Sequence, residues 1–124
     1  MSPIYRDVLM VEDDDTFARV VSRNLVSRGV TVRRAANATE ASAQIHERRP
    51  DLVLLDINLP DRTGWDVLRE CRDGGVLPTI VLSATALSAE RLAEFRPVAF
   101  LRKPFPLDVI LRLVVGEPAE AAAS

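Results

Sequence analysis

The sequence has very few of the residues that cross-link small folds or bind zinc. Its 124 residues include one cysteine, Cys71, and one histidine, His46. A single cysteine cannot form an internal disulfide, so nothing in the composition indicates an oxidising compartment. A lone histidine without paired cysteines does not suggest a zinc site, and we expect His46 to be a solvated helix residue.

Long hydrophobic runs and a strong charge imbalance are also missing. Apolar stretches such as Leu52–Leu55 are far shorter than the roughly 20 residues that a bilayer-spanning helix needs. The segment Met1–Asp7 has no apolar stretch after its basic residue, so we expect no signal peptide, no membrane contact and a cytoplasmic location. The net charge of −2 gives no general attraction to nucleic acid, so direct contact of this domain with nucleic acid is not expected.

The chain does contain a regular alternation of short apolar runs and longer amphipathic ones. Strands are predicted at Val8–Val11, Val30–Val32, Leu52–Leu55, Thr79–Leu82 and Val98–Leu101. Helices are predicted between them from apolar residues three and four apart, from caps at Asn37 and Ser88, from Gly29 at a helix end, and from a last run over Leu107–Val115. Five strands alternating with five helices predict one open α/β sheet covered on both faces. We expect residues 1–116 to form the domain and 117–124 a low-complexity tail or the start of a linker.

Four of the predicted strands end in a polar or ionisable residue directly after the apolar run. These residues are Glu12 and Asp13 after the first strand, Asp56 after the third, Ser83 after the fourth and Lys103 after the fifth. Parallel strands point the same way, so these side chains are expected to converge on one edge, where open α/β sheets bind their ligands. The second strand ends in Ala35–Ala36 and is expected to contribute nothing.

Three carboxylates at close quarters repel one another unless a cation neutralises them. Mg²⁺ is the natural candidate because it prefers oxygen ligands, with Asp13 and Asp56 as direct ligands and Glu12 acting through water. Together with Lys103, such a site could stabilise a phosphoryl group during its transfer to a carboxylate. The neighbouring acids Asp14 and Asp15 are better explained as residues that favour the start of the first helix.

Four segments, taken together, resemble the signatures of response-regulator receiver domains of bacterial two-component systems. They are Met10–Asp14, Leu54–Pro60 with Gly64, Ser83–Ala84, and Lys103–Phe105, and the resemblance spans the chain from Asp7 to Val115. It implies a doubly wound (βα)5 flavodoxin-like three-layer sandwich, with a parallel five-stranded sheet in the order 2-1-3-4-5. In that order the switch point lies between the first and third strands, which carry the acids.

The resemblance also assigns roles to residues. It implies that Asp56 is the phospho-acceptor, and that Glu12 and Asp13 are the acidic pair of a Mg²⁺ site. The backbone carbonyl of Asn58, two residues after the acceptor, would be a further metal ligand.

Three more roles follow from the resemblance. Ser83 would be the switch hydroxyl, Lys103 the lysine that contacts the phosphate, and Phe100 the aromatic whose rotamer follows activation. A phenylalanine at that position is a mild departure because it lacks the tyrosine hydroxyl. The peptide bond between Lys103 and Pro104 is usually cis in the family.

The implied function is that of a phosphorylation switch in a phosphorelay. A sensor histidine kinase or phosphotransfer protein would donate the phosphoryl group to Asp56, and the face formed by the fourth helix, fifth strand and fifth helix would signal to an effector or a second copy of the chain. The stretch from Ser83 to Lys103 is shorter than in most members, and Arg96–Ala99 replaces the usual Gly-Ala turn, so we expect a short fourth helix. The sequence does not identify the cognate kinase or the output.

Other functions fit less well or remain as alternatives. The shortened fourth region motivates a receiver-like interaction module that needs no phosphorylation. A phosphatase with an aspartate nucleophile would carry a second aspartate where this chain has Asn58, and acids after the first strand would repel the phosphate of a flavin. The chain is therefore not expected to be an enzyme.

Two features leave two interpretations each. Trp65 could line the rim of the acidic site or pack the third helix. The last helix is apolar around nearly its whole circumference, which indicates either a partner surface or burial under the tail or against the fourth helix.

Overall fold

Five parallel strands form one sheet in the order β2-β1-β3-β4-β5 in the computed structural model, which describes residues 2–117. This confirms the expected fold class and strand order. The strands are β1 (Asp7–Val11), β2 (Thr31–Ala35), β3 (Leu52–Asp56), β4 (Thr79–Ser83) and β5 (Ala99–Arg102). The helices are α1 (Asp15–Val26), α2 (Ala38–Glu47), α3 (Gly64–Glu70), the 3-10 turn η1 (Arg72–Gly74), α4 (Ala89–Phe95) and α5 (Leu107–Val115). Beyond Glu117, the predicted tail or linker lies outside the described residues.

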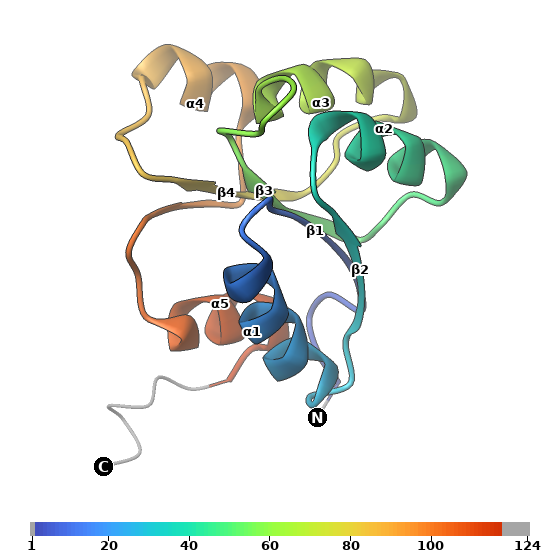
Figure 1. Cartoon of the computed structure of the whole chain (residues 1–124), viewed down its shortest axis with the longest axis vertical. Helices are drawn as coiled ribbons and strands as arrows, with labels where there is room; N and C mark the ends of the chain where they lie inside the picture. The colour runs from blue at the N-terminus through green and yellow to red at the C-terminus, as the bar shows by residue number, and fades with distance from the viewer. Residues whose placement is uncertain (1, 118–124) are drawn as a thin grey trace.

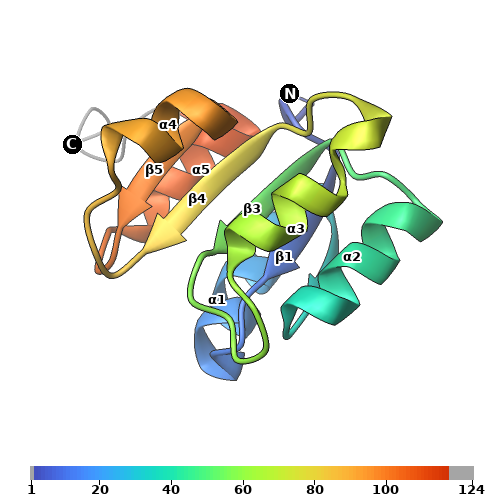
Figure 2. The same cartoon turned by 90° about the horizontal axis from the view of Figure 1, so that it is seen from above.

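The helices cover both faces of the sheet and make three layers. Helices α1 and α5 lie on one face, and α2, α3 and α4 on the other (Figure 1), while the view from above shows β3 between β1 and β4 (Figure 2). Alternate residues of each strand point to opposite faces, so Met10 and Leu54 belong to the core under α1 and α5, whereas Val11 and Leu55 belong to the core under α2 and α3. Both faces of the central strands are therefore buried.

The ends of the first helix follow the expected capping chemistry. The N–H of Phe17 donates to the carboxylate of Asp14 at 3.1 Å, so Asp14 caps α1 as predicted. At the other end Gly29 has a φ of 88°, and the N–H groups of Gly29 and Val30 donate to the carbonyls of Val26 and Leu25. This pair of bonds closes the helix in the Schellman pattern, which needs a residue that tolerates positive φ.

The fourth helix is short, as the sequence predicted. It has seven residues, of which none is buried, and Ser88 caps it by accepting the N–H of Arg91 at 3.2 Å. Trp65 at the start of α3 is 6% exposed and stacks on Phe95 of α4 with a centroid distance of 4.8 Å. Of the two interpretations of Trp65, packing of the third helix is the confirmed one.

The apolar circumference of α5 is largely covered within the domain. Ile110, Leu111, Val114 and Val115 are buried in the core shared with β1, β3 and α1. The N-terminal segment joins them, since the N–H of Tyr5 donates to the carbonyl of Val114 at 3.1 Å. Burial is therefore observed, but α1 and the N-terminal segment provide it, whereas the sequence pointed to the tail or the fourth helix. Among residues 2–117, no helix has the length and apolar character needed to cross a bilayer.

Candidate metal centre

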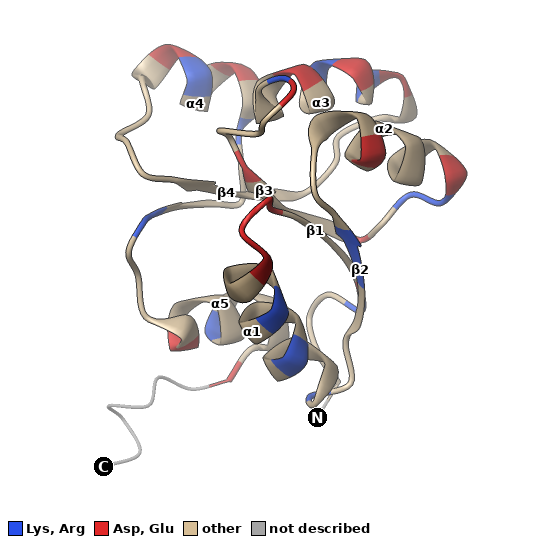
Figure 3. Cartoon of the chain, in the orientation of Figure 1, with Lys and Arg blue, Asp and Glu red and all other residues tan. Residues whose placement is uncertain are grey.

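Three carboxylates meet at the carboxyl ends of β1 and β3, which are neighbours in the sheet. Glu12, Asp13 and Asp56 each offer an oxygen, and these oxygens lie within 4.8 Å of one another. Glu12 and Asp56 are buried because they follow Met10 and Leu54 by two residues and so continue the same inward face, whereas Asp13 is exposed. The charge map shows acidic colour on the segment between β1 and α1 (Figure 3). The expected acidic pocket at the switch point is thus present.

Lys103 reaches this cluster from the loop after β5. Its Nζ donates to Glu12 Oε1 at 2.6 Å and to Asp56 Oδ2 at 3.3 Å. Its N–H donates to the carbonyl of Ser83 at 2.8 Å, and the bond to Pro104 is cis, as the resemblance implied. The ring of Phe17 lies 4.9 Å from Nζ and adds a cation–π contact. The ammonium is therefore held between two buried acids and an aromatic face.

Burial and charge shift the pKa values of Glu12 and Lys103. Burial raises the pKa of Glu12 to about 7, and the Asp56 carboxylate adds to the rise, although the Lys103 hydrogen bond opposes it. Burial alone would lower the pKa of Lys103, but the hydrogen bond to Glu12 and the charge of Asp56 outweigh it and raise that pKa. One ammonium thus faces three carboxylates, and a hard cation with oxygen ligands would complete the charge balance.

The loop after β3 holds the Asp56 carboxylate by its backbone. The N–H of Asn58 donates to Asp56 Oδ1 at 3.0 Å, and Asn58 forms an isolated antiparallel bridge with Thr63. Asp61 ties the same loop to α2 by accepting the N–H groups of Ala38 at 2.9 Å and Thr39 at 3.0 Å. The bond from Ala38, followed by those from Thr39, holds the pKa of Asp61 well below its usual range. The loop that follows Asp56 is therefore anchored both to the Asp56 carboxylate and to α2.

Ser83 and Phe100 lie beside the acids but on the other face of the sheet. Ser83 is buried at the end of β4, and its Oγ accepts the N–H of Thr85 at 3.1 Å and hydrogen-bonds to the Thr85 hydroxyl at 3.2 Å. Phe100 pairs with Val81 and is half-buried in the core under α2 and α3. The structure thus places every predicted site residue at or beside the carboxyl edge of β1, β3, β4 and β5.

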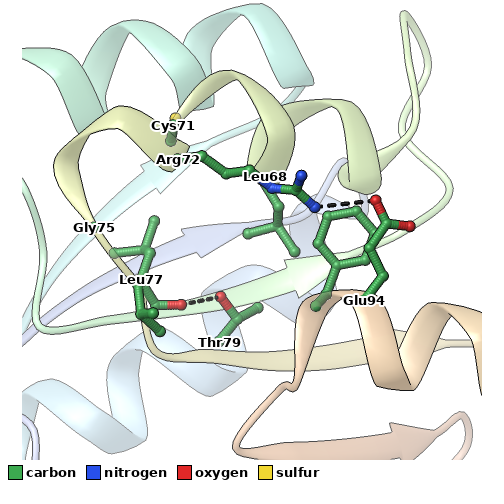
Figure 4. Close-up of a pocket in the computed structure, with 9 residues that line it drawn as sticks. Leu68, Cys71, Arg72, Gly75, Leu77, Thr79 and Glu94 are labelled. Carbon is green, nitrogen blue, oxygen red and sulfur yellow. Dashed lines mark hydrogen bonds and ion pairs between the residues drawn. The ribbon is translucent and has the colours of Figure 1, made fainter.

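A cavity of about 340 Å³ lies away from this edge, between η1, the start of β4 and α4. Figure 4 shows Leu68 and Leu77 in its wall and the ion pair of Arg72 with Glu94 across it. The acids instead lie at the edge of the sheet, with Asp13 exposed. That placement suits an ion that keeps part of its water shell, as Mg²⁺ does.

Sequence reasoning missed two residues at the centre. Phe17 was not among the predicted site residues, although its ring contacts Lys103. Arg34 of β2 donates to the carbonyl of Glu12 at 3.0 Å, so the expectation that the second strand contributes nothing is wrong. The sequence did contain a signal for Arg34, because a charged residue at an inward-facing strand position needs a polar partner.

These observations define a doubly wound α/β protein with an acidic, lysine-bearing centre at its switch point. The family model of the response regulator receiver domain matches residues 8–115, and the chain belongs to that family. Receiver domains are the phosphorylation-dependent signalling modules of two-component systems and are not classical enzymes. Members of the family bind Mg²⁺ at an acidic pocket.

Curated relatives and solved structures agree with this assignment. The chain is 36% identical over 110 residues to the probable transcriptional regulatory protein TcrX of Mycobacterium tuberculosis, covering 86% of this chain and 47% of TcrX. It is 34% identical over 101 residues to the KDP operon transcriptional regulatory protein KdpE of Escherichia coli, covering 80% and 45%. The chain therefore spans less than half the length of these relatives.

Two solved structures share the fold closely. The chemotaxis protein CheY4 of Vibrio cholerae matches with a TM-score of 0.77 and 28% identity, covering 88% of this chain and 95% of that one. The response regulator TrrA of Thermotoga maritima, solved in complex with Mg(2+)-BeF, matches with a TM-score of 0.75 and 25% identity, covering 87% and 95%.

Proposed function

We propose that Asp56 accepts the phosphoryl group of this receiver in a Mg²⁺-dependent reaction. The observation that carries the proposal is the convergence of three acids, Glu12, Asp13 and Asp56. The Lys103 ammonium hydrogen-bonds to two of them, Glu12 and Asp56. An oxygen of Asp56 forms a bond to phosphorus while the bond from phosphorus to the donor nitrogen breaks, and the electron pair leaves with that nitrogen. The donor is a sensor histidine kinase or a phosphotransfer protein.

The donor set fits Mg²⁺ because it consists of oxygens at close range. Asp13 and Asp56 would bind the ion directly, the backbone carbonyl of Asn58 would supply another ligand, and Glu12 would act through water. Bound there, Mg²⁺ would neutralise charge on the transferring phosphoryl oxygens.

Lys103 and Ser83 complete the proposed chemistry from opposite faces of the sheet. Lys103 already contacts Asp56 Oδ2 at 3.3 Å and would pair with a phosphoryl oxygen once Asp56 carries the phosphoryl group. The Ser83 hydroxyl, which bonds to Thr85 in this structure, would turn to donate to the phosphoryl group. Phe100 follows, because it lies on the same face as Ser83, and the balance between two conformations shifts.

The wider role of the protein is also a proposal. The face of α4, β5 and α5 would present the change to an effector or to a second copy of the chain. Residues 1–116 would act as the domain in a cytoplasmic phosphorelay. Because the relatives of about twice the length are named as transcriptional regulators, the output would come from outside this domain, without nucleic-acid contact by the receiver itself.

The proposal is tested with Mg²⁺ and the small phosphodonor acetyl phosphate. Intact-mass spectrometry should show a gain of one phosphoryl group on the full chain, and chelation of Mg²⁺ should prevent it. Asp56→Asn should abolish the gain, whereas Asp73→Asn, the same change at an exposed acid of η1, should not. A phosphorylated Asp56→Asn variant would show that another residue is the acceptor.

A second candidate function is a receiver-like interaction module that works without phosphorylation. The short, unburied α4 favours it, and the intact acidic centre argues against it. If neither Mg²⁺ nor acetyl phosphate changes the mass or the Trp65 fluorescence of the chain, this second candidate is the better one.

A further inference from the structure

The four consecutive acids after β1, residues 12–15, differ in the groups that they contact. Asp14 caps α1 through the N–H of Phe17, and Asp15 is occupied by two arginines, Arg19 at 2.6 Å and Arg34. The hydrogen bond from Arg34, followed by the charge of Arg19, lowers the pKa of Asp15. Only Glu12 and Asp13 remain to face the metal centre with Asp56.

Arg34 has the contacts needed to hold this loop in place. It lies opposite Met10 in the β1–β2 register, so its side chain starts on the α1 face of the sheet. Its Nη2 donates to the carbonyl of Glu12 at 3.0 Å and to that of Asp13 at 3.5 Å, and its Nε lies 3.4 Å from the Glu12 carbonyl. Its Nη1 pairs with Asp15.

One planar guanidinium therefore hydrogen-bonds to two successive carbonyls of the loop that carries the acids and pairs with Asp15 at the start of α1. The fixed fork of arginine donors suits such a task, since several hydrogen bonds can form without rearranging the side chain. The two carbonyls belong to the peptide that links Glu12 to Asp13 and to the peptide that follows it. Holding them restricts the direction in which Asp13, the exposed acid, can point its carboxylate.

We propose that Arg34 is a positioning residue of the metal centre, which orients Asp13 towards the cation through the backbone of its loop. This inference rests on the proposed function, since it assumes that Mg²⁺ binds at Glu12, Asp13 and Asp56. It gives β2, the edge strand, a role in the chemistry.

The positioning role and simple electrostatics predict opposite changes in Mg²⁺ affinity when Arg34 is removed. A positive charge near a dication repels it, so charge alone predicts tighter Mg²⁺ binding without Arg34. If Arg34 orients Asp13, its removal instead weakens binding, because the ligand loses its preferred direction. Outer partners of metal ligands typically change affinity by about 10–100-fold.

The test is the Mg²⁺ dissociation constant of the full chain, measured by titration calorimetry. We expect Arg34→Met, which keeps the apolar stem, to weaken Mg²⁺ binding about tenfold. Arg34→Gln should recover part of the loss, because its amide can still donate to the Glu12 carbonyl. The control Arg19→Met removes a charge from the same Asp15 and should not weaken binding, since the contacts of Arg19 do not include the loop carbonyls.

Unfolding in chelator, followed by circular dichroism, shows which variants are folded before Mg²⁺ is added. If Arg34→Met does not fold, the comparison of Arg34→Gln with the wild type decides the matter, with the same expected direction. Wild-type binding combined with equal or tighter binding by the folded Arg34 variants overturns the role of Arg34 and leaves the metal centre intact. A wild-type chain that binds no Mg²⁺ overturns the proposed centre itself.

Discussion

Gly64 lies tightly against the backbone of the segment that carries Asp56. A Cβ at this position would lie 2.8 Å from the backbone oxygen of Asp56 and 3.1 Å from the Cα of Ile57. The N–H of Gly64 also donates to the carbonyl of Ile57 at 2.8 Å, so the two segments cannot separate without losing a buried hydrogen bond. The first turn of α3 thus fixes the backbone that presents the acceptor carboxylate.

We predict that Gly64→Ala destabilises the domain by about 1–3 kcal/mol, because the added methyl group meets backbone atoms. Gly74→Ala is the matched control, since a Cβ there meets only the guanidinium end of Arg49, a flexible side chain. It should change stability by about 0.5 kcal/mol or less. Urea unfolding measures both, and equal losses in the two variants would contradict the steric argument.

Asp61 makes the anchoring of the acceptor loop depend on pH. Its native pKa lies below its unfolded value because Ala38 and Thr39 donate to its ionised form. Its contribution to stability is therefore complete above the unfolded pKa of about 3.9 and is lost as pH falls towards the native pKa. We predict that Asp61→Asn is less stable than the wild type at neutral pH and that the difference shrinks below about pH 4. Thermal unfolding of both chains across this pH range is the measurement. A stability difference that does not depend on pH would contradict the prediction.

At the scale of elements, α4 has no buried residue of its own. Contacts between aromatic and charged side chains, called the clasp below, hold it to α3 and η1. Phe95 stacks on Trp65, and the guanidinium groups of Arg72 and Arg69 lie 5.1 and 5.3 Å from its ring. Glu94 accepts a hydrogen bond from Arg72 at 3.0 Å (Figure 4). Since Trp65 follows Gly64 directly, the clasp connects the acceptor segment to the fourth helix.

Loss of the Phe95 ring should therefore free α4 and expose Trp65. We predict that Phe95→Ala shifts the emission of this single tryptophan to longer wavelength and speeds amide exchange in α4, with a stability loss of about 2 kcal/mol. Leu92→Ala changes the same helix at a residue that is 38% exposed and should leave the emission in place. Unchanged emission in Phe95→Ala would mean that other groups shield Trp65.

The elements were largely predictable from the sequence because their signals are local. The apolar run Leu52–Leu55 and the Asn37 cap each act within a few residues, and both appear in the structure. The covering of α5 by Tyr5 and the stacking of Trp65 on Phe95 join residues far apart in the chain. Such contacts depend on how the layers pack, so pattern and spacing alone left them open.

Most of the site was predictable because its residues follow the ends of strands, but this rule does not find every residue of the site. Parallel topology brings every strand end to one edge, so Glu12, Asp56 and Lys103 could be grouped before their distances were known. Arg34 sits before the end of its strand and reaches the loop only because of the β1–β2 register and its own length. A rule based on strand ends overlooks such a residue.

At the scale of the whole molecule, the sheet separates the charged residues of the site from the two proposed switch residues. Glu12, Asp56 and Lys103 continue the face covered by α1 and α5, whereas Ser83 and Phe100 belong to the face covered by α2, α3 and α4 (Figure 1). A phosphoryl group at the sheet edge would be within reach of both faces. The edge is thus the place where a change of charge on one side can alter packing on the other.

The same edge couples metal binding to the stability of the domain. Three acids within 4.8 Å repel one another in the metal-free chain, so Asp13→Asn should be more stable than the wild type in chelator. Mg²⁺ should reverse the order, because a ligand that binds only the folded state adds about 2.7 kcal/mol at a hundredfold excess over its dissociation constant. Asp13→Asn lacks one of the two proposed direct ligands, so Mg²⁺ should stabilise it little. Urea unfolding of both chains, with Mg²⁺ and with chelator, tests this reversal in their order of stability. If Mg²⁺ stabilises both chains equally, the ion binds away from Asp13.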